Sequence, residues 1–186
     1  MKSGSPLIST YPTERWKYTS TAQFLHWILA ILIVGMIGLG WYMMSIEKQP
    51  NSDSYFNLHK SIGLIVASLV IMRLIWRAFH RRAPLPFTVE GWQVTLAALT
   101  QVMLYVGMIV MPATGIAGVA FSKDGLAFFG MALPKFVSPD HAISELLFNV
   151  HGAAVWILVF LILLHVAGAL KHLILDRDGV FQRMLP

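Results

Sequence analysis

The chain has 186 residues, of which 56% are hydrophobic and 12% are charged, and its formal net charge is +5. A soluble domain is typically about a quarter charged, so this composition excludes an ordinary soluble enzyme and favours a protein that folds in a bilayer. The chain contains no cysteine, which excludes disulfides, thiolate metal sites, cysteine-held iron–sulfur clusters and covalently attached c-type haem.

Hydrophobic runs recur along the whole chain, and each of them is long enough to cross a bilayer as a helix. The third run contains Pro112 and Gly115, which predict a kink or a last turn that lies in the membrane interface. The length suits one compact unit, so we predict an all-α fold: an integral membrane four-helix bundle that forms a single transmembrane domain over residues 1–186. The predicted spans cover roughly residues 22–44, 58–79, 94–120 and 144–173.

The basic residues lie at the ends of these runs, which favours an orientation signal over a nucleic-acid surface. Ten of them fall on one side of the predicted membrane and four on the other. The positive-inside rule therefore predicts that both termini are cytoplasmic. The cytoplasmic group is Lys2, Arg15, Lys17, Arg73, Arg77, Arg81, Arg82, Lys171, Arg177 and Arg183, and the outer group is Lys48, Lys60, Lys123 and Lys135.

Four histidines lie inside the predicted spans at matched depths. His59 begins the second span and His151 lies early in the fourth, so both are on the outer side. His26 lies near the start of the first span, on the inner side. His165 follows His151 by fourteen residues, about 21 Å of helix, which brings it to the inner side as well. Depth alone predicts two layers of paired imidazoles, one near each membrane surface.

Ionisable side chains inside a membrane are costly and usually functional. Two imidazoles from facing helices can hold a haem from both sides, with both axial positions of the iron closed, an arrangement that favours electron transfer over oxygen chemistry. A structural alternative is that these histidines only form hydrogen bonds between helices. Zinc is disfavoured, because it requires three or four ligands together and depth separates these histidines into two pairs.

The order of short motifs along the chain resembles the bacterial di-haem cytochrome b561 family, which is related to the membrane cytochrome b subunits of hydrogenases. The resemblance implies two haem b groups, one held by His26 and His165 and the other by His59 and His151. Gln101 stands where family members often carry a histidine, so we assign it no ligand role. The matching motifs are FLHW (24–27), LHKSIG (58–63), MRLIWR (72–77), Tyr105 with Pro112 and Gly115, NVHG (149–152), LLHVAGALKH (163–172) and RMLP (183–186).

The resemblance also implies a function in the bacterial inner (cytoplasmic) membrane. The characterised branch oxidises superoxide at the outer face and reduces ubiquinone at the inner face, which would make this chain a superoxide:ubiquinone oxidoreductase. Its partners would then be lipid, quinone and superoxide or another periplasmic donor. The alternative is a non-enzymatic electron conduit that serves a partner dehydrogenase or a periplasmic redox protein.

Three further expectations concern residues outside the four histidines. His172 continues the stripe two turns beyond His165, at the level where a quinone headgroup would lie, so it is a candidate quinone contact or proton donor. Arg73 and Arg77 lie four residues apart near the depth of the inner pair, and both are candidate partners for a haem propionate. Membrane anchoring is the alternative for both, and it is favoured for Arg77. Lys60, next to His59, is a candidate for an outer propionate or an anionic donor. The connection 126–136 is expected to form an interfacial helix over the outer site.

Overall fold

The computed structural model describes residues 17–80, 85–86 and 88–186. Lys2, Arg15, Arg81 and Arg82, which contribute to the predicted charge asymmetry, lie outside the described residues. Within the described part, long helices account for most of the chain. These helices are α1 (Ser20–Ser45), α2 (Ser52–Phe79), α3 (Gly91–Ala120) and α4 (His141–Lys171), followed by a π-helical turn η1 (His172–Asp176) and a 3-10 turn η2 (Phe181–Met184).

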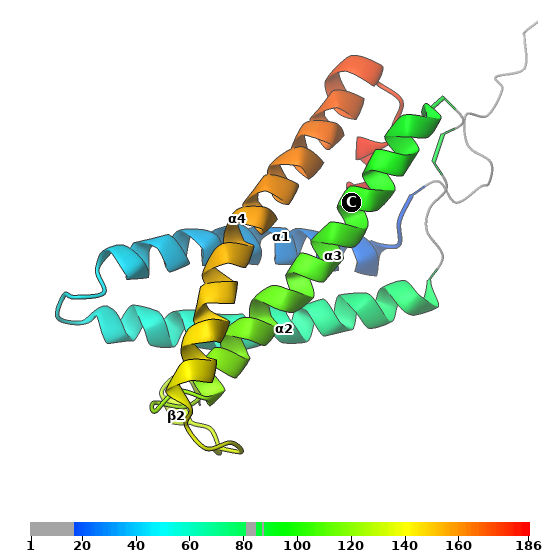
Figure 1. The fold of residues 1–186 in the computed structure, drawn as a ribbon. Coiled ribbons are helices and arrows are strands. Elements are labelled where there is room, and N and C mark those ends of the chain that lie inside the picture. Colours follow the sequence, from blue (N-terminus) through cyan, green and yellow to red (C-terminus); the bar gives the residue numbers. More distant parts are fainter. Residues whose placement is uncertain (1–16, 81–84, 87) are drawn as a thin grey trace, which may run out of the picture.

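The helices form two antiparallel pairs that cross each other (Figure 1). One pair is α1 with α2, the other is α3 with α4, and α2 packs on α3 where the pairs meet. Helices α1 and α3 begin, and α2 and α4 end, at the end of the bundle that also holds the C-terminus; we call this the terminal end. The opposite end, where α1 turns into α2 and α3 connects to α4, is called the loop end.

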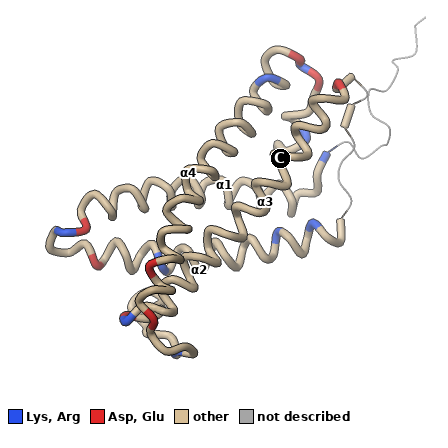
Figure 2. The backbone as a smooth tube through the Cα atoms, in the orientation of Figure 1, with Lys and Arg blue, Asp and Glu red and all other residues tan. Residues whose placement is uncertain are grey.

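Four of the described helices are long and apolar enough to cross a membrane. Their surfaces carry many exposed apolar side chains, among them Phe24, Ile31 and Trp156. In a bilayer such a surface faces lipid, which is as apolar as the side chains themselves. Charged residues gather near the helix ends and in the connections and leave long uncharged stretches between them (Figure 2). The prediction of an all-α, four-helix membrane fold is confirmed.

Local capping explains where two of the helices begin. The Thr19 side chain accepts a hydrogen bond from the amide of Ala22 at 3.3 Å, and the Asp140 carboxylate accepts one from the amide of Ile143 at 3.1 Å. Each interaction pairs a backbone donor that the first turn of a helix leaves without a partner. Helix α3 contains Pro112 and nevertheless continues without a break to Ala120.

The connection between α3 and α4 is a short hairpin rather than the expected interfacial helix. Strands β1 (Ala127–Phe128) and β2 (Met131–Ala132) pair antiparallel. Phe129 and Gly130 form the turn with φ values of 44° and 86°, the positive values that a tight two-residue hairpin turn requires. The expectation of a helix was therefore wrong, because turn chemistry at Phe129–Gly130 outweighed the apolar content of the segment.

Side-chain contacts fix both ends of the bundle. At the loop end, the amide of Phe129 donates to the hydroxyl of Ser61 on α2 at 2.9 Å. At the terminal end, the side-chain amide of Gln23 on α1 donates to the carbonyl of Leu185 at 2.7 Å, and the indole of Trp27 donates to the carbonyl of Met184 at 2.9 Å. The last residues of the chain are thereby held against the start of α1.

Candidate functional site

At the loop end, the structure brings His59 of α2 next to His151 of α4. Their ring centroids are 6.3 Å apart and the rings are inclined by 80°. Both side chains are half-buried between the two helix pairs. Two residues separated by 92 positions in the sequence therefore present their imidazoles to one another in the interior of the bundle.

The ring of His151 is oriented by α3. Its Nδ1 lies 2.9 Å from the carbonyl oxygen of Met111 and 3.3 Å from the hydroxyl of Thr114. A carbonyl can only accept, so Nδ1 carries the proton and donates it to Met111. The lone pair of Nε2 is then free, which is the state in which a neutral imidazole binds a metal.

Two glycines leave the space that these imidazoles occupy. A Cβ added at Gly115 would lie 3.1 Å from Cε1 and 3.2 Å from Nδ1 of His151, tighter than nearly all real contacts of this kind. A Cβ at Gly40 would meet Cε1 of His59 at 3.4 Å. The Nδ1 of His59 is buried and has no hydrogen-bond partner among the residues that the structure describes. A side chain at position 115 would therefore require the His151 ring to shift by a few tenths of an ångström.

At the terminal end, His26 of α1 lies next to His165 of α4. Their ring centroids are 6.1 Å apart and the rings are inclined by 72°. Arg73 of α2 approaches the same site: its guanidinium donates to the carbonyl of Ala22 at 3.1 Å and lies 3.3 Å from Nδ1 of His26. This pair therefore has a cation beside it.

The ring separations suit a metal held between two imidazoles. Metal–nitrogen bonds of about 2 Å, with about 1 Å more from each nitrogen to the centre of its ring, put the two centroids roughly 6 Å apart. The measured separations, 6.1 Å and 6.3 Å, match this value. Each pair supplies two nitrogen ligands, which is the axial set of a bis-histidine haem and too few for a tetrahedral zinc site.

In the terminal-end pair, the tautomer of His26 is not the one that binds a metal through Nε2. A guanidinium has donors only, so in the observed contact His26 accepts through Nδ1 and carries its proton on Nε2. Binding a metal through Nε2 requires the opposite tautomer. We therefore expect Arg73 to leave His26 when haem binds, and an anionic propionate is a partner that a guanidinium prefers over a neutral imidazole.

For Arg77, one turn beyond Arg73 on α2, the sequence favours an anchor at the membrane surface over a propionate partner. The structure instead directs it inward: its guanidinium carbon lies 5.9 Å from the centre of the Tyr105 ring on α3. Its Nη2 is buried and has no hydrogen-bond partner among the described residues. A buried donor of this kind is a second candidate for an anionic group at the terminal end. No signal in the sequence distinguished it from an anchor, because side-chain direction depends on how α2 meets α3.

The remaining histidines lie away from the two pairs. His172 follows α4 at the terminal end, where its Nδ1 lies 2.7 Å from a carboxylate oxygen of Asp178. His80 stacks on Trp76 with centroids 3.8 Å apart, and His141 lies 3.6 Å from Glu145 in an exposed ion pair. Lys60 is adjacent to His59 in sequence and is half-buried. Sequence reasoning missed Asp178, which becomes visible as a partner of His172 only once the chain turns back after α4.

Four apolar helices with two histidine pairs between them, one near each end of the bundle, define the class of this protein: a membrane cytochrome b that transfers electrons. The family model for prokaryotic cytochrome b561 matches residues 17–186. The chain belongs to the prokaryotic cytochrome b561 family. It is therefore a multi-pass bacterial membrane protein that binds haem b.

Named relatives cover nearly the whole chain. Cytochrome b561 homolog 1 of Escherichia coli (strain K12) is 30% identical over 178 residues, which are 91% of this chain and 97% of the relative. Cytochrome b561 homolog 2 of the same strain is 30% identical over 185 residues, 95% of this chain and 94% of the relative. The probable superoxide oxidase CybB of Yersinia pestis is 23% identical over 175 residues, 91% of this chain and 96% of the relative.

Proposed function

We propose that the protein is a di-haem superoxide:ubiquinone oxidoreductase of the bacterial inner membrane, with His59 and His151 as the ligands of an outer haem and His26 and His165 as those of an inner haem. The observation that carries the proposal is the pair of imidazole separations, 6.3 Å and 6.1 Å, at opposite ends of the bundle. The two histidines on α4 lie fourteen residues apart, about 21 Å along the helix.

Haem b, when bound in both positions, supplies one-electron transfer across the membrane and no open coordination site for oxygen. The chain supplies the orientation and the charge. Met111 holds His151 through Nδ1, which leaves Nε2 for a ligand, and Gly115 and Gly40 leave room for the two outer imidazoles. Arg73 places positive charge beside the inner pair, and Arg77 adds a second cation one turn further along α2. This charge favours anionic groups and the accumulation of an electron at the inner haem.

The proposed acceptor site lies beyond the inner pair. His172 is seven residues past His165, about 10 Å further along α4, and its side chain is 13% exposed. The imidazole can donate a hydrogen bond or a proton to a quinone oxygen at this depth. The support from relatives is a superoxide oxidase name at 23% identity.

The proposed orientation places the terminal end in the cytoplasm. The chain has no cysteine, so a single introduced cysteine is a unique label. Gln49 in the turn between α1 and α2 and Arg177 after η1 are both exposed. In intact cells treated to permeabilise only the outer membrane, an impermeant maleimide should label Gln49→Cys and should label Arg177→Cys only after the inner membrane is opened. The reverse pattern would contradict the orientation.

The activity is tested with the purified chain alone. A reduced-minus-oxidised spectrum should show a b-type α band, and the haem content should be two per chain. Superoxide generated enzymatically should reduce these haems, and a soluble ubiquinone should reoxidise them. A spectrum with two haems but no reduction by superoxide would contradict superoxide as donor while leaving the haem assignment intact.

A second candidate is an electron conduit for a partner redox protein, and the charge of the outer end favours it. The proposed outer side carries four lysines and five acidic residues, so it has no net attraction for an anion such as superoxide. If superoxide fails as donor, a partner that delivers electrons by direct docking at the loop end takes its place. The charged residues counted are Lys48, Lys60, Lys123, Lys135, Glu47, Asp53, Asp124, Asp140 and Glu145.

A further inference from the structure

Helix α4 changes its geometry at the histidine that was assigned a quinone role. Regular α-helix ends at Lys171, and His172–Asp176 form a π-helical turn. Single π-helical turns of this kind are rare and are frequent at functional sites. The chain then reverses at Arg177, which has a φ of 51°, and this reversal brings Asp178 back against His172.

Asp178 is held in place and points at the imidazole. Its Oδ2 lies 2.7 Å from Nδ1 of His172, and its Oδ1 accepts a hydrogen bond from the amide of Val180 at 3.0 Å. The Asp178 side chain is 9% exposed and that of His172 is 13% exposed. Asp176 lies further from the same nitrogen, at 3.2 Å, and is shared with the ammonium of Lys171 at 2.5 Å. Asp178 is therefore the closer and more buried carboxylate.

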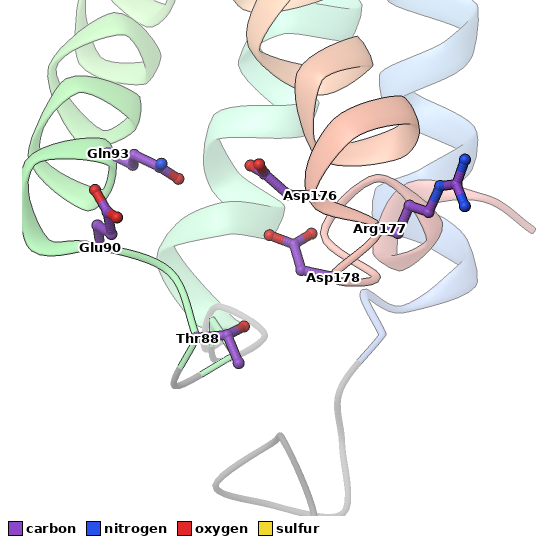
Figure 3. Close-up of a pocket in the computed structure, with 6 residues that line it drawn as sticks. All are labelled: Thr88, Glu90, Gln93, Asp176, Arg177 and Asp178. Carbon is purple, nitrogen blue, oxygen red and sulfur yellow. The ribbon is translucent and has the colours of Figure 1, made fainter.

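The carboxylates border an open pocket at the terminal end. A pocket of about 410 Å³ is lined by Asp176, Arg177 and Asp178 on one side and by residues at the start of α3 on the other. Figure 3 shows the carboxylates of Asp176 and Asp178 turned toward Glu90 and Gln93, whereas the Arg177 side chain points away. The pocket thus places polar groups and space for water next to the carboxylate that contacts His172.

We propose that Asp178 is a positioning residue that holds His172 as a proton donor to the quinone and that the pocket beside it supplies the replacement proton; this rests on the proposed function. A hydrogen bond from Nδ1 of His172 to the Asp178 carboxylate fixes the orientation of the ring. With Nδ1 donating to Asp178, Nε2 is the ring nitrogen that remains for a ligand.

The proton and electron balance is simple. Reduction of a quinone to a quinol takes two electrons and two protons, and two superoxide anions give the two electrons as they are oxidised to two molecules of O₂. His172 takes up a proton from the solvent in the pocket and passes it from Nε2 to a reduced quinone oxygen, so an N–H bond breaks and an O–H bond forms. The imidazole regains a proton from water in the pocket and repeats the step for the second oxygen.

The test uses the full chain with its haems, reduced with dithionite and then mixed with a soluble ubiquinone. Asp178→Asn should leave the haem spectrum and the melting temperature as in the wild type. It should slow reoxidation by tenfold or more, through kcat rather than KM, and should enlarge the solvent deuterium isotope effect, because proton delivery becomes limiting. Asp178→Glu, which restores the charge, should recover much of the rate.

Two companion variants separate this role from a general loss of charge or of structure. Asp53→Asn removes the same charge from an exposed position at the loop end and should react like the wild type. In a His172→Ala background, Asp178→Asn should add no further loss, since the carboxylate acts through the imidazole.

The outcomes distinguish the role of Asp178 from the choice of ubiquinone as the acceptor. If ubiquinone fails to reoxidise the wild-type haems, the proposed acceptor is wrong and the role of Asp178 falls with it. If the wild type is reoxidised but Asp178→Asn reacts at the same rate, or loses as much in the His172→Ala background as in the wild type, the inference alone is overturned. Loss of haem or of thermal stability in Asp178→Asn that Asp178→Glu does not restore would likewise overturn it, because the role would then be structural.

Discussion

The two histidine pairs have nearly equal ring separations and very different surroundings. At the loop end, the His151 ring is oriented by a backbone carbonyl of α3 and confined by a glycine. At the terminal end, His26 faces the guanidinium of Arg73 instead. The first site is built from neutral, rigid backbone groups and the second from a charged and movable side chain. A rigid neutral site fixes ligand geometry, whereas a cation beside the second site makes that site the better place for an electron.

The largest effect is expected when one ligand is removed from either pair. His151→Ala should lose the outer haem and keep the inner one, and His26→Ala should do the reverse, because each pair binds independently about 21 Å from the other. Haem content per chain should fall from two to one in either variant. His141→Ala, at an exposed histidine, is the control and should retain both haems. Full haem content in His151→Ala would contradict the assignment.

The second largest effect should come from Gly115→Ala. The added Cβ would press on His151 at 3.1 Å and 3.2 Å, so the ring must shift, while helix propensity itself favours alanine. We expect partial loss of outer haem or an altered spectrum of that haem, with the inner haem unaffected. Gly35→Ala has open space around it and serves as the matched control. Identical spectra for the two variants would show that the outer site is not confined in this way.

Arg73→Gln tests whether the positive charge beside the inner pair raises the midpoint potential of the inner haem. Loss of a positive charge beside the inner pair should disfavour its reduced state by on the order of 1 kcal/mol, a lowering of some tens of millivolts in the inner midpoint potential. The outer potential should change little. A redox titration monitored by the haem spectrum measures both values, with Arg177→Gln, an exposed residue, as the charge control. An unchanged midpoint potential of the inner haem would contradict a role of Arg73 in stabilising its reduced state.

The smallest effect is expected from Thr114→Val. The hydroxyl lies 3.3 Å from Nδ1 of His151, but the carbonyl of Met111 at 2.9 Å remains the main acceptor. Both haems should stay bound, and the outer potential should move by less than the inner one does in Arg73→Gln. A loss of outer haem in Thr114→Val would mean that the hydroxyl, and not the carbonyl, orients the ring.

The sequence predicted the helical layout because the length of an uncharged apolar run can be read from local composition. It also paired the four histidines by depth, since depth in a helix follows directly from residue number at about 1.5 Å per residue. It misjudged 126–136, where apolar content favoured a helix and the positive φ values at Phe129 and Gly130 produced a hairpin. It left Arg77 between an anchor and a propionate partner, with the anchor favoured, and the structure adds that the guanidinium carbon lies 5.9 Å from the centre of the Tyr105 ring.

The sequence by itself determined that this protein consists of membrane-spanning helices and that its imidazoles form two layers, because run length and depth along a helix both follow from residue number alone. The tertiary structure decided what surrounds each imidazole. Met111 lies on another helix from His151, Arg73 on another helix from His26, and Asp178 reaches His172 only through the reversal at Arg177. Such contacts depend on how helices cross and where the chain turns back, and no spacing along the sequence encodes them directly.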